Sequence, residues 1–168
     1  MTHRTKDLFI VGPPGVEEWM EDFANRCYRE ITRDVGYKRH YVDAQPGHEQ
    51  KAGDISFVSV PMNHVKDSGM SAYGFRAIIN GKSVAYTGDT MFTEDIYELG
   101  KGADVLVVDC TYAEGGGPEH MGLEDVKIVR KKLPQSTAIV LTHRNGEPKT
   151  DGLANVHIAR DMETLRFG

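Results

Sequence analysis

The sequence has little cysteine and no long apolar run, and each shortage excludes a class of protein. The two cysteines, Cys27 and Cys110, lack the paired spacing of a metal finger, so we expect buried thiols rather than a disulfide framework or a nucleophile. No apolar stretch is long enough to span a bilayer. The first apolar run, at 8–11, stops at Gly12 and lacks the length of a signal-peptide core. We therefore expect a cytoplasmic protein with no membrane partner.

Basic residues are in the minority, with 20 Lys and Arg against 25 Asp and Glu, for a formal charge of −5. This balance gives no general attraction for nucleic acid. The one tight basic cluster, 130–132, ends an expected helix, where cations stabilise the negative end of the helix dipole. The 39% hydrophobic and 27% charged content is that of an ordinary globular protein, and we expect residues 1–168 to form a single domain.

Strand and helix patterns alternate along the chain with short connections, which predicts an α/β fold. The hairpin at 72–89 is the strongest of these predictions, because Asn80-Gly81 is a preferred two-residue turn between two strand-forming runs. Residues 45–54 are rich in turn formers and are expected to be a connection. The expected strands are 7–12, 37–44, 54–62, the two strands of the hairpin at 72–89, 103–110, 137–143 and a closing pair within 154–167, and the expected helices are 16–36, 93–102 and 123–134.

Three residues with metal-binding side chains come directly after strand patterns: His64, Asp89 and His143. The ends of strands are where α/β folds commonly assemble sites. Two imidazoles and a carboxylate there would suit a divalent ion such as zinc or manganese. Taken alone, a residue of this kind after a strand is more often a hydrogen-bonded turn residue than a ligand, and sequence spacing cannot show that the three converge.

Several longer motifs resemble one family. The segments "FIVGPPGVEEWM", "YGFRAIINGKSVAYTGDT", "GADVLVVDCTY", "EHMGLEDV" and "IVLTH" are similar, in order and spacing, to the later part of the metallo-β-lactamase superfamily, particularly its ribonuclease Z-like phosphodiesterases. The resemblance implies an αββα sandwich, in which helices cover the outer faces of two mixed sheets. It also implies two adjacent metals, with His64 binding the first, Asp89 bridging both and His143 binding the second. In the same way it implies catalytic roles for Asp89 and for His120, which would lie near the scissile bond.

The chain departs from the family at one motif, because no His-x-His-x-Asp-His segment occurs in it. In the family that segment precedes the position of "GPPG" and lies among the opening strands of the first sheet. We therefore expect an incomplete domain with its first strands missing: a truncated hydrolase, one half of a split enzyme, or a shortened module that binds metal or protein without catalysis. An incomplete sheet exposes a strand edge, so we expect a homodimer or a complementing chain.

The segment between the first and second candidate ligands, 65–88, is too short to hold the long arm with which ribonuclease Z grips transfer RNA. Pre-tRNA is therefore an unlikely substrate on this resemblance. We expect a small phosphodiester or another ester instead.

Overall fold

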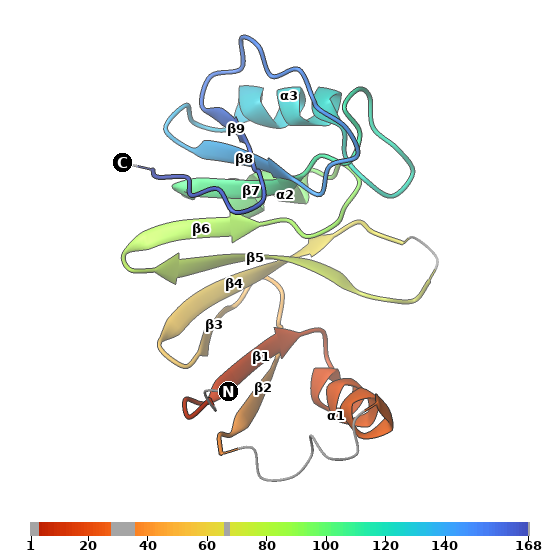
Figure 1. The fold of residues 1–168 in the computed structure, drawn as a ribbon, viewed down its shortest axis with the longest axis vertical. Helices are drawn as coiled ribbons and strands as arrows, with labels where there is room; N and C mark the ends of the chain where they lie inside the picture. The colour runs from red at the N-terminus through yellow and green to blue at the C-terminus, as the bar shows by residue number, and fades with distance from the viewer. Residues whose placement is uncertain (1–3, 28–35, 66–67, 168) are drawn as a thin grey trace.

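The computed structural model describes residues 4–27, 36–65 and 68–167, which form a mixed α/β fold with two separate sheets (Figure 1). A small parallel sheet joins β1 and β2, and a larger mixed sheet joins β3 to β9 in sequence order. The strands are β1 (Leu8–Gly12), β2 (Arg39–Asp43), β3 (Glu49–Ala52), β4 (Ile55–Met62), β5 (Ala72–Ile79), β6 (Lys82–Tyr86), β7 (Val105–Asp109), β8 (Ala138–Thr142) and β9 (Val156–Ile158). The helices are α1 (Val16–Cys27), α2 (Asp95–Gly100) and α3 (Leu123–Lys132).

The larger sheet changes direction at β6. Strands β3 to β6 pair antiparallel, whereas β6 to β9 pair parallel. The β5–β6 turn has positive φ at both Asn80 (52°) and Gly81 (77°), as a two-residue hairpin turn requires, so the predicted hairpin is confirmed. The parallel half brings the C-terminal ends of β6, β7 and β8 to one edge of the sheet.

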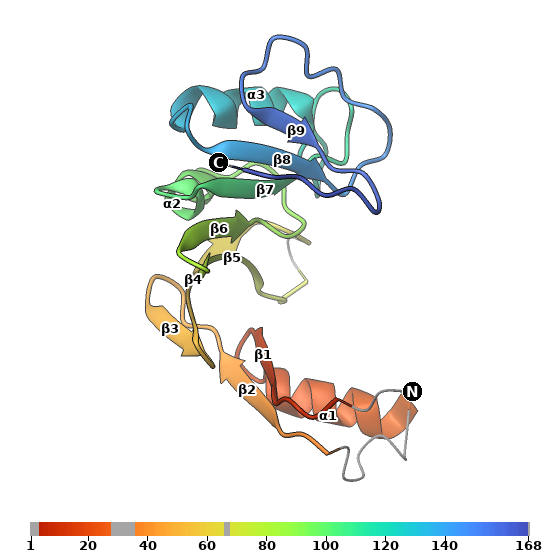
Figure 2. The ribbon, with the colours of Figure 1, turned by 60° about the vertical axis from the view of Figure 1, so that its left-hand side comes forward.

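The core lies on both faces of this parallel half. On one face, α2 and α3 pack over alternate residues of β7 and β8, such as Leu106 and Ile139, which are fully buried. On the other face, Val105 and Val140 are covered by the C-terminal segment through Leu165 and Phe167 (Figure 2). Burial on both faces explains why β7 and β8 are continuous apolar runs rather than alternating ones.

The N-terminal unit is less well covered. Figure 2 shows α1 lying beside the β1–β2 sheet, yet none of the twelve residues of this helix is buried. Trp19 and Phe23 are 64% and 52% exposed and stack on each other, with ring centroids 5.7 Å apart. The predicted extension of this helix to Gly36 falls mostly outside the described residues. Within the described ranges, neither β1 nor β2 pairs with a third strand.

Three expectations were wrong. The predicted connection at 45–54 contains an edge strand, β3. Its polar sequence, Glu-Gln-Lys, lacks the apolar pattern by which strands are predicted. The predicted closing strand pair is one short strand, β9, followed by turns up to residue 167. Cys27 is exposed on α1, whereas Cys110 is buried as predicted. None of the helices in the described ranges is both long and apolar enough to cross a membrane.

Candidate metal centre

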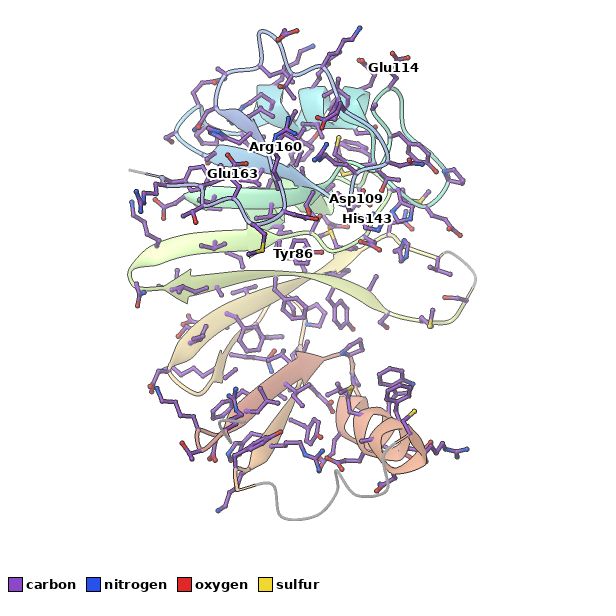
Figure 3. All side chains as sticks on the ribbon, viewed as in Figure 1. Tyr86, Asp109, Glu114, His143, Arg160 and Glu163 are labelled. Atoms are coloured by element: carbon purple, nitrogen blue, oxygen red, sulfur yellow. The ribbon has the colours of Figure 1, made fainter. Side chains whose placement is uncertain are left out.

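A cluster of four side chains lies at the C-terminal edge of the parallel strands. Asp89, Asp109, His120 and His143 each offer one ligand atom, and these atoms all lie within 4.8 Å of one another. Asp89 follows β6, Asp109 ends β7 and His143 follows β8, whereas His120 comes from the loop before α3. Figure 3 shows Asp109 and His143 close together at this edge. The sheet therefore assembles residues that are far apart in the sequence.

Local backbone conformation positions the side chains of Asp89 and His143 in the cluster. Gly88 adopts φ +65°, a conformation that glycine reaches without steric cost, so β6 can turn sharply into Asp89. His143 adopts φ +51°, which is uncommon for a residue with a Cβ atom. Such strain persists where the surrounding structure fixes it, often at functional sites. The ladder register opposes Asp109 to Thr142, which brings the adjacent His143 beside that carboxylate.

Asp109 is the most enclosed member of the cluster, with no exposed surface. Its Oδ2 accepts hydrogen bonds from the backbone N–H of Thr90 at 3.1 Å and from Nδ1 of His120 at 2.7 Å. Its Oδ1 accepts from the backbone N–H and the hydroxyl of Thr111, at 2.9 and 2.7 Å. Both oxygens are thus already satisfied by donors of the protein. We therefore interpret Asp109 as the carboxylate that orients His120 rather than as a metal ligand.

The hydrogen bonds also fix the tautomers of the histidines. Nδ1 of His120 faces a carboxylate, so this nitrogen carries the proton. The Thr111 hydroxyl donates its one proton to Oδ1 of Asp109, at 2.7 Å, or to the carbonyl oxygen of His143, at 2.9 Å, so it accepts from Nδ1 of His143 at 2.8 Å. When either ring is neutral, its lone pair is consequently on Nε2. Nε2 of His143 lies 3.6 Å from Oδ2 of Asp89, a separation that suits two ligands of one ion better than a direct hydrogen bond.

His64 stands beside this cluster but is not one of the four. Its Nδ1 donates to the backbone carbonyl of Glu119 at 3.0 Å, which again leaves the lone pair on Nε2. Its ring centroid lies 5.0 Å from that of His120, which in turn lies 4.9 Å from that of His143. The three imidazoles form a continuous row. The structure thus places all four residues singled out in the sequence, His64, Asp89, His120 and His143, in one region.

The sequence analysis missed Asp109. The residue ends the buried run "VLVVD", just as Asp89 follows a strand, so the same pattern could have identified it. Asp109 was missed because the whole apolar run was assigned to the core of the protein.

The electrostatics of the centre reflect its carboxylates. Burial, together with the charge of the neighbouring Asp109, raises the pKa of the Cys110 thiol to about 11. Burial also raises the pKa of Tyr86, and the charges of Asp89 and Asp109 add to this shift. A cation would relieve this local excess of negative charge. Nε2 of His143 and a carboxylate oxygen of Asp89, with the imidazole of His64 adjacent, form a donor set that fits a divalent metal.

A family model matches most of the chain. Residues 1–143 match the model described as "Beta-lactamase superfamily domain". A curated relative, "Zinc phosphodiesterase ELAC protein 2 homolog" of Caenorhabditis elegans, is 32% identical in an alignment 108 residues long that covers 57% of this chain and 13% of that protein.

Solved structures show the same fold. Human tRNase Z, short form, superposes with a TM-score of 0.69 at 13% identity, covering 96% of this chain and 67% of that one. Zn²⁺-bound PqqB from Methylobacterium extorquens gives 0.68 at 18% identity, covering 98% and 67%. A diphosphatase from the PhnP family gives 0.67 at 19% identity, covering 99% and 61%. The chain thus spans about two thirds of the length of these structures and a small part of the curated relative.

Proposed function

Because the chain belongs to the metallo-β-lactamase superfamily, we propose that it is a metal-dependent hydrolase, or the metal-binding part of one, acting on a small phosphodiester or ester. The observation that carries this proposal is the row of imidazoles beside Asp89. In the two rings within the cluster, those of His120 and His143, the hydrogen bonds of Nδ1 leave Nε2 free to bind metal or exchange a proton. A histidine that served only as a turn residue would not need this arrangement in three neighbouring rings.

We propose zinc as the metal, with manganese as the alternative. His143 and Asp89 would hold it, and His64 would complete or extend the set, with Asp89 as the bridging carboxylate if two ions bind. Imidazole nitrogen and carboxylate oxygen are common zinc ligands, and three protein ligands suffice for an open site. The zinc-bound fold relative and the zinc phosphodiesterase relative support this choice. Bound there, the metal would act as a Lewis acid on a phosphoryl or acyl oxygen.

His120 has a different proposed task from the metal ligands. The buried carboxylate of Asp109 holds its Nδ1 proton, so Nε2 is the atom that accepts a proton from, or donates one to, the reacting group. When the ring becomes charged, the adjacent Asp109 carboxylate stabilises the imidazolium. The pair therefore serves as a positioned acid or base whose orientation is fixed before substrate arrives.

The proposed substrate is small. Between His64 and Asp89 the described chain forms only β5, β6 and their short connections, without an inserted domain that could grip a large RNA. The phosphodiesterase and diphosphatase relatives support a phosphoryl centre. The alternative is a module that binds metal without catalysis, which the absence of a His-x-His-x-Asp-His segment from the sequence favours.

One experiment separates the two. Hydrolysis of bis(4-nitrophenyl) phosphate is measured with zinc or manganese for the unmodified chain and for H120A, with H157A as a control, because His157 lies on β9 away from the cluster. The hydrolase proposal expects metal-dependent turnover that falls by about a hundredfold in H120A, with metal content retained. Bound metal with no turnover in any form would establish the binding module instead.

A further inference from the structure

The largest apolar cavity described lies between the N-terminal unit and β5. It has a volume of about 690 Å³ and is formed by β1, the "GPPG" turn, the first turns of α1 and the start of β5. Its wall includes Ile10, Val16, Trp19, Met70 and Tyr73. Of the described residues that line it, none is charged, whereas the other described cavities are lined by Glu, Lys, Asp or Arg side chains.

One residue of the cavity wall, Tyr73, also lies beside the strands that lead into the candidate metal centre. A Cβ atom on Gly88 would lie 3.7 Å from the carbonyl oxygen of Tyr73, and Gly88 directly precedes Asp89. Tyr73 also pairs with Pro61 on β4, the strand that leads into His64. The side of Tyr73 that borders the cavity therefore adjoins the two strand ends that carry His64 and Asp89.

The wall of the cavity carries large apolar side chains that the rest of the chain leaves uncovered. Trp19 is 64% exposed and Met70 is 69% exposed. Aromatic and thioether groups bind planar apolar groups well, because the ring offers a flat face and the sulfur is polarisable. The volume lies within the range of small-molecule sites, which are mostly apolar with a few polar groups near the reacting centre.

We propose that this cavity binds an aromatic group of the substrate while its phosphoryl or acyl group lies at the metal centre. The inference rests on the proposed function and gives it a substrate class: aryl or arylalkyl esters of phosphoric or carboxylic acids. Trp19 and Met70 act as specificity-determining residues, since they contact the part of the substrate that does not react. Alkyl esters of similar charge are bound less tightly because they leave the wall exposed to water.

Trp19 is the only tryptophan in the chain, so its fluorescence reports directly on the cavity. The zinc-loaded protein is titrated with phenylphosphonate and with methylphosphonate, neither of which has an ester bond to hydrolyse. The phenyl compound is expected to bind about tenfold more tightly, equivalent to about 1.4 kcal/mol, and to change Trp19 emission. M70A is expected to lose most of this preference, whereas the control M162A, changed at a fully exposed methionine, keeps it.

A second titration separates this inference from the proposed function. Metal-free protein is titrated with 4-nitrobenzyl alcohol, a neutral aromatic compound whose binding next to Trp19 quenches its emission. Quenching that M70A weakens supports the cavity assignment even if no phosphonate binds and the hydrolase proposal fails. Equal affinity for the two phosphonates with unchanged Trp19 emission would overturn the inference. Weaker quenching at higher protein concentration would also overturn it, because a second copy would then occupy the cavity.

Discussion

Replacement of Asp109 by asparagine tests whether this buried carboxylate orients the centre. The change keeps the size of the side chain but replaces one oxygen by an NH₂ group. Whichever way the amide turns, this group meets one backbone N–H, that of Thr90 or that of Thr111. An unsatisfied buried donor costs about 1–3 kcal/mol, and the remaining hydrogen bonds become neutral and weaker. We expect a loss of about 3 kcal/mol in the free energy of unfolding.

Urea denaturation of the metal-free protein measures this loss. With a slope of about 2 kcal/mol per molar urea, the midpoint should fall by about 1.5 M. Zinc affinity, measured by competition with a chromophoric chelator, should change little, because Asp109 orients His120 and neither residue is assigned as a metal ligand. The control D22N loses only a surface pair with Arg26, in which both side chains are more than half exposed, and should cost less than about 1 kcal/mol.

Two results would contradict this account of Asp109. An unchanged urea midpoint would mean that its four hydrogen bonds contribute no net stability. Loss of zinc affinity by about tenfold or more, with stability retained, would identify Asp109 or His120 as part of the metal site.

Three further predictions follow from other parts of the chain. At pH 8 a thiol reagent should modify the exposed Cys27 rapidly and the buried Cys110 slowly. The pKa of Cys110 is raised to about 11, so this thiol forms little thiolate until the pH approaches that value. Equal rates for the two cysteines would contradict this prediction. G74A should lower the free energy of unfolding, measured by urea titration, by about 1–3 kcal/mol. The added Cβ atom would lie 2.7 Å from a methyl carbon of Leu99 and 3.0 Å from the carbonyl oxygen of Tyr86. Stability equal to that of the unmodified protein would show that the sheet can shift to accept the methyl group. We also propose a homodimer formed along the β1–β2 sheet, which light scattering should report at twice the chain mass of 18.7 kDa, and a monomer at all concentrations would exclude it.

Much of the fold could be predicted because its patterns are local. The hairpin is determined by Asn80-Gly81, a turn that needs positive φ. Strands β7 and β8 are determined by short apolar runs, which are buried on both faces of the sheet. Strand β3 was missed because its stability comes from its partner β4 and not from its own polar sequence. The exposure of Cys27 was missed because an apolar stripe on a helix predicts that this face is buried. The sequence does not show whether another part of the chain covers the stripe of α1, and none of its residues is buried.

The candidate site could be predicted only in part. Strand ends identified His64, Asp89 and His143, because the polar residue after a strand is visible in the sequence. Asp109 and the orientation of His120 depend on contacts between residues 11 or more positions apart in loops and strands, which sequence spacing does not reveal. The resemblance supplied His120, and the structure supplied the carboxylate that holds it.

Metal content is the measurement that tests the central claim most directly. Protein purified without a chelating tag is analysed by inductively coupled plasma mass spectrometry, beside D89A, H143A and H120A. We predict stoichiometric zinc or manganese in the unmodified chain and in H120A, and its loss in D89A and H143A. Absence of metal from the unmodified chain after incubation with excess zinc, or equal metal in all four proteins, would contradict the assignment of Asp89 and His143 as ligands.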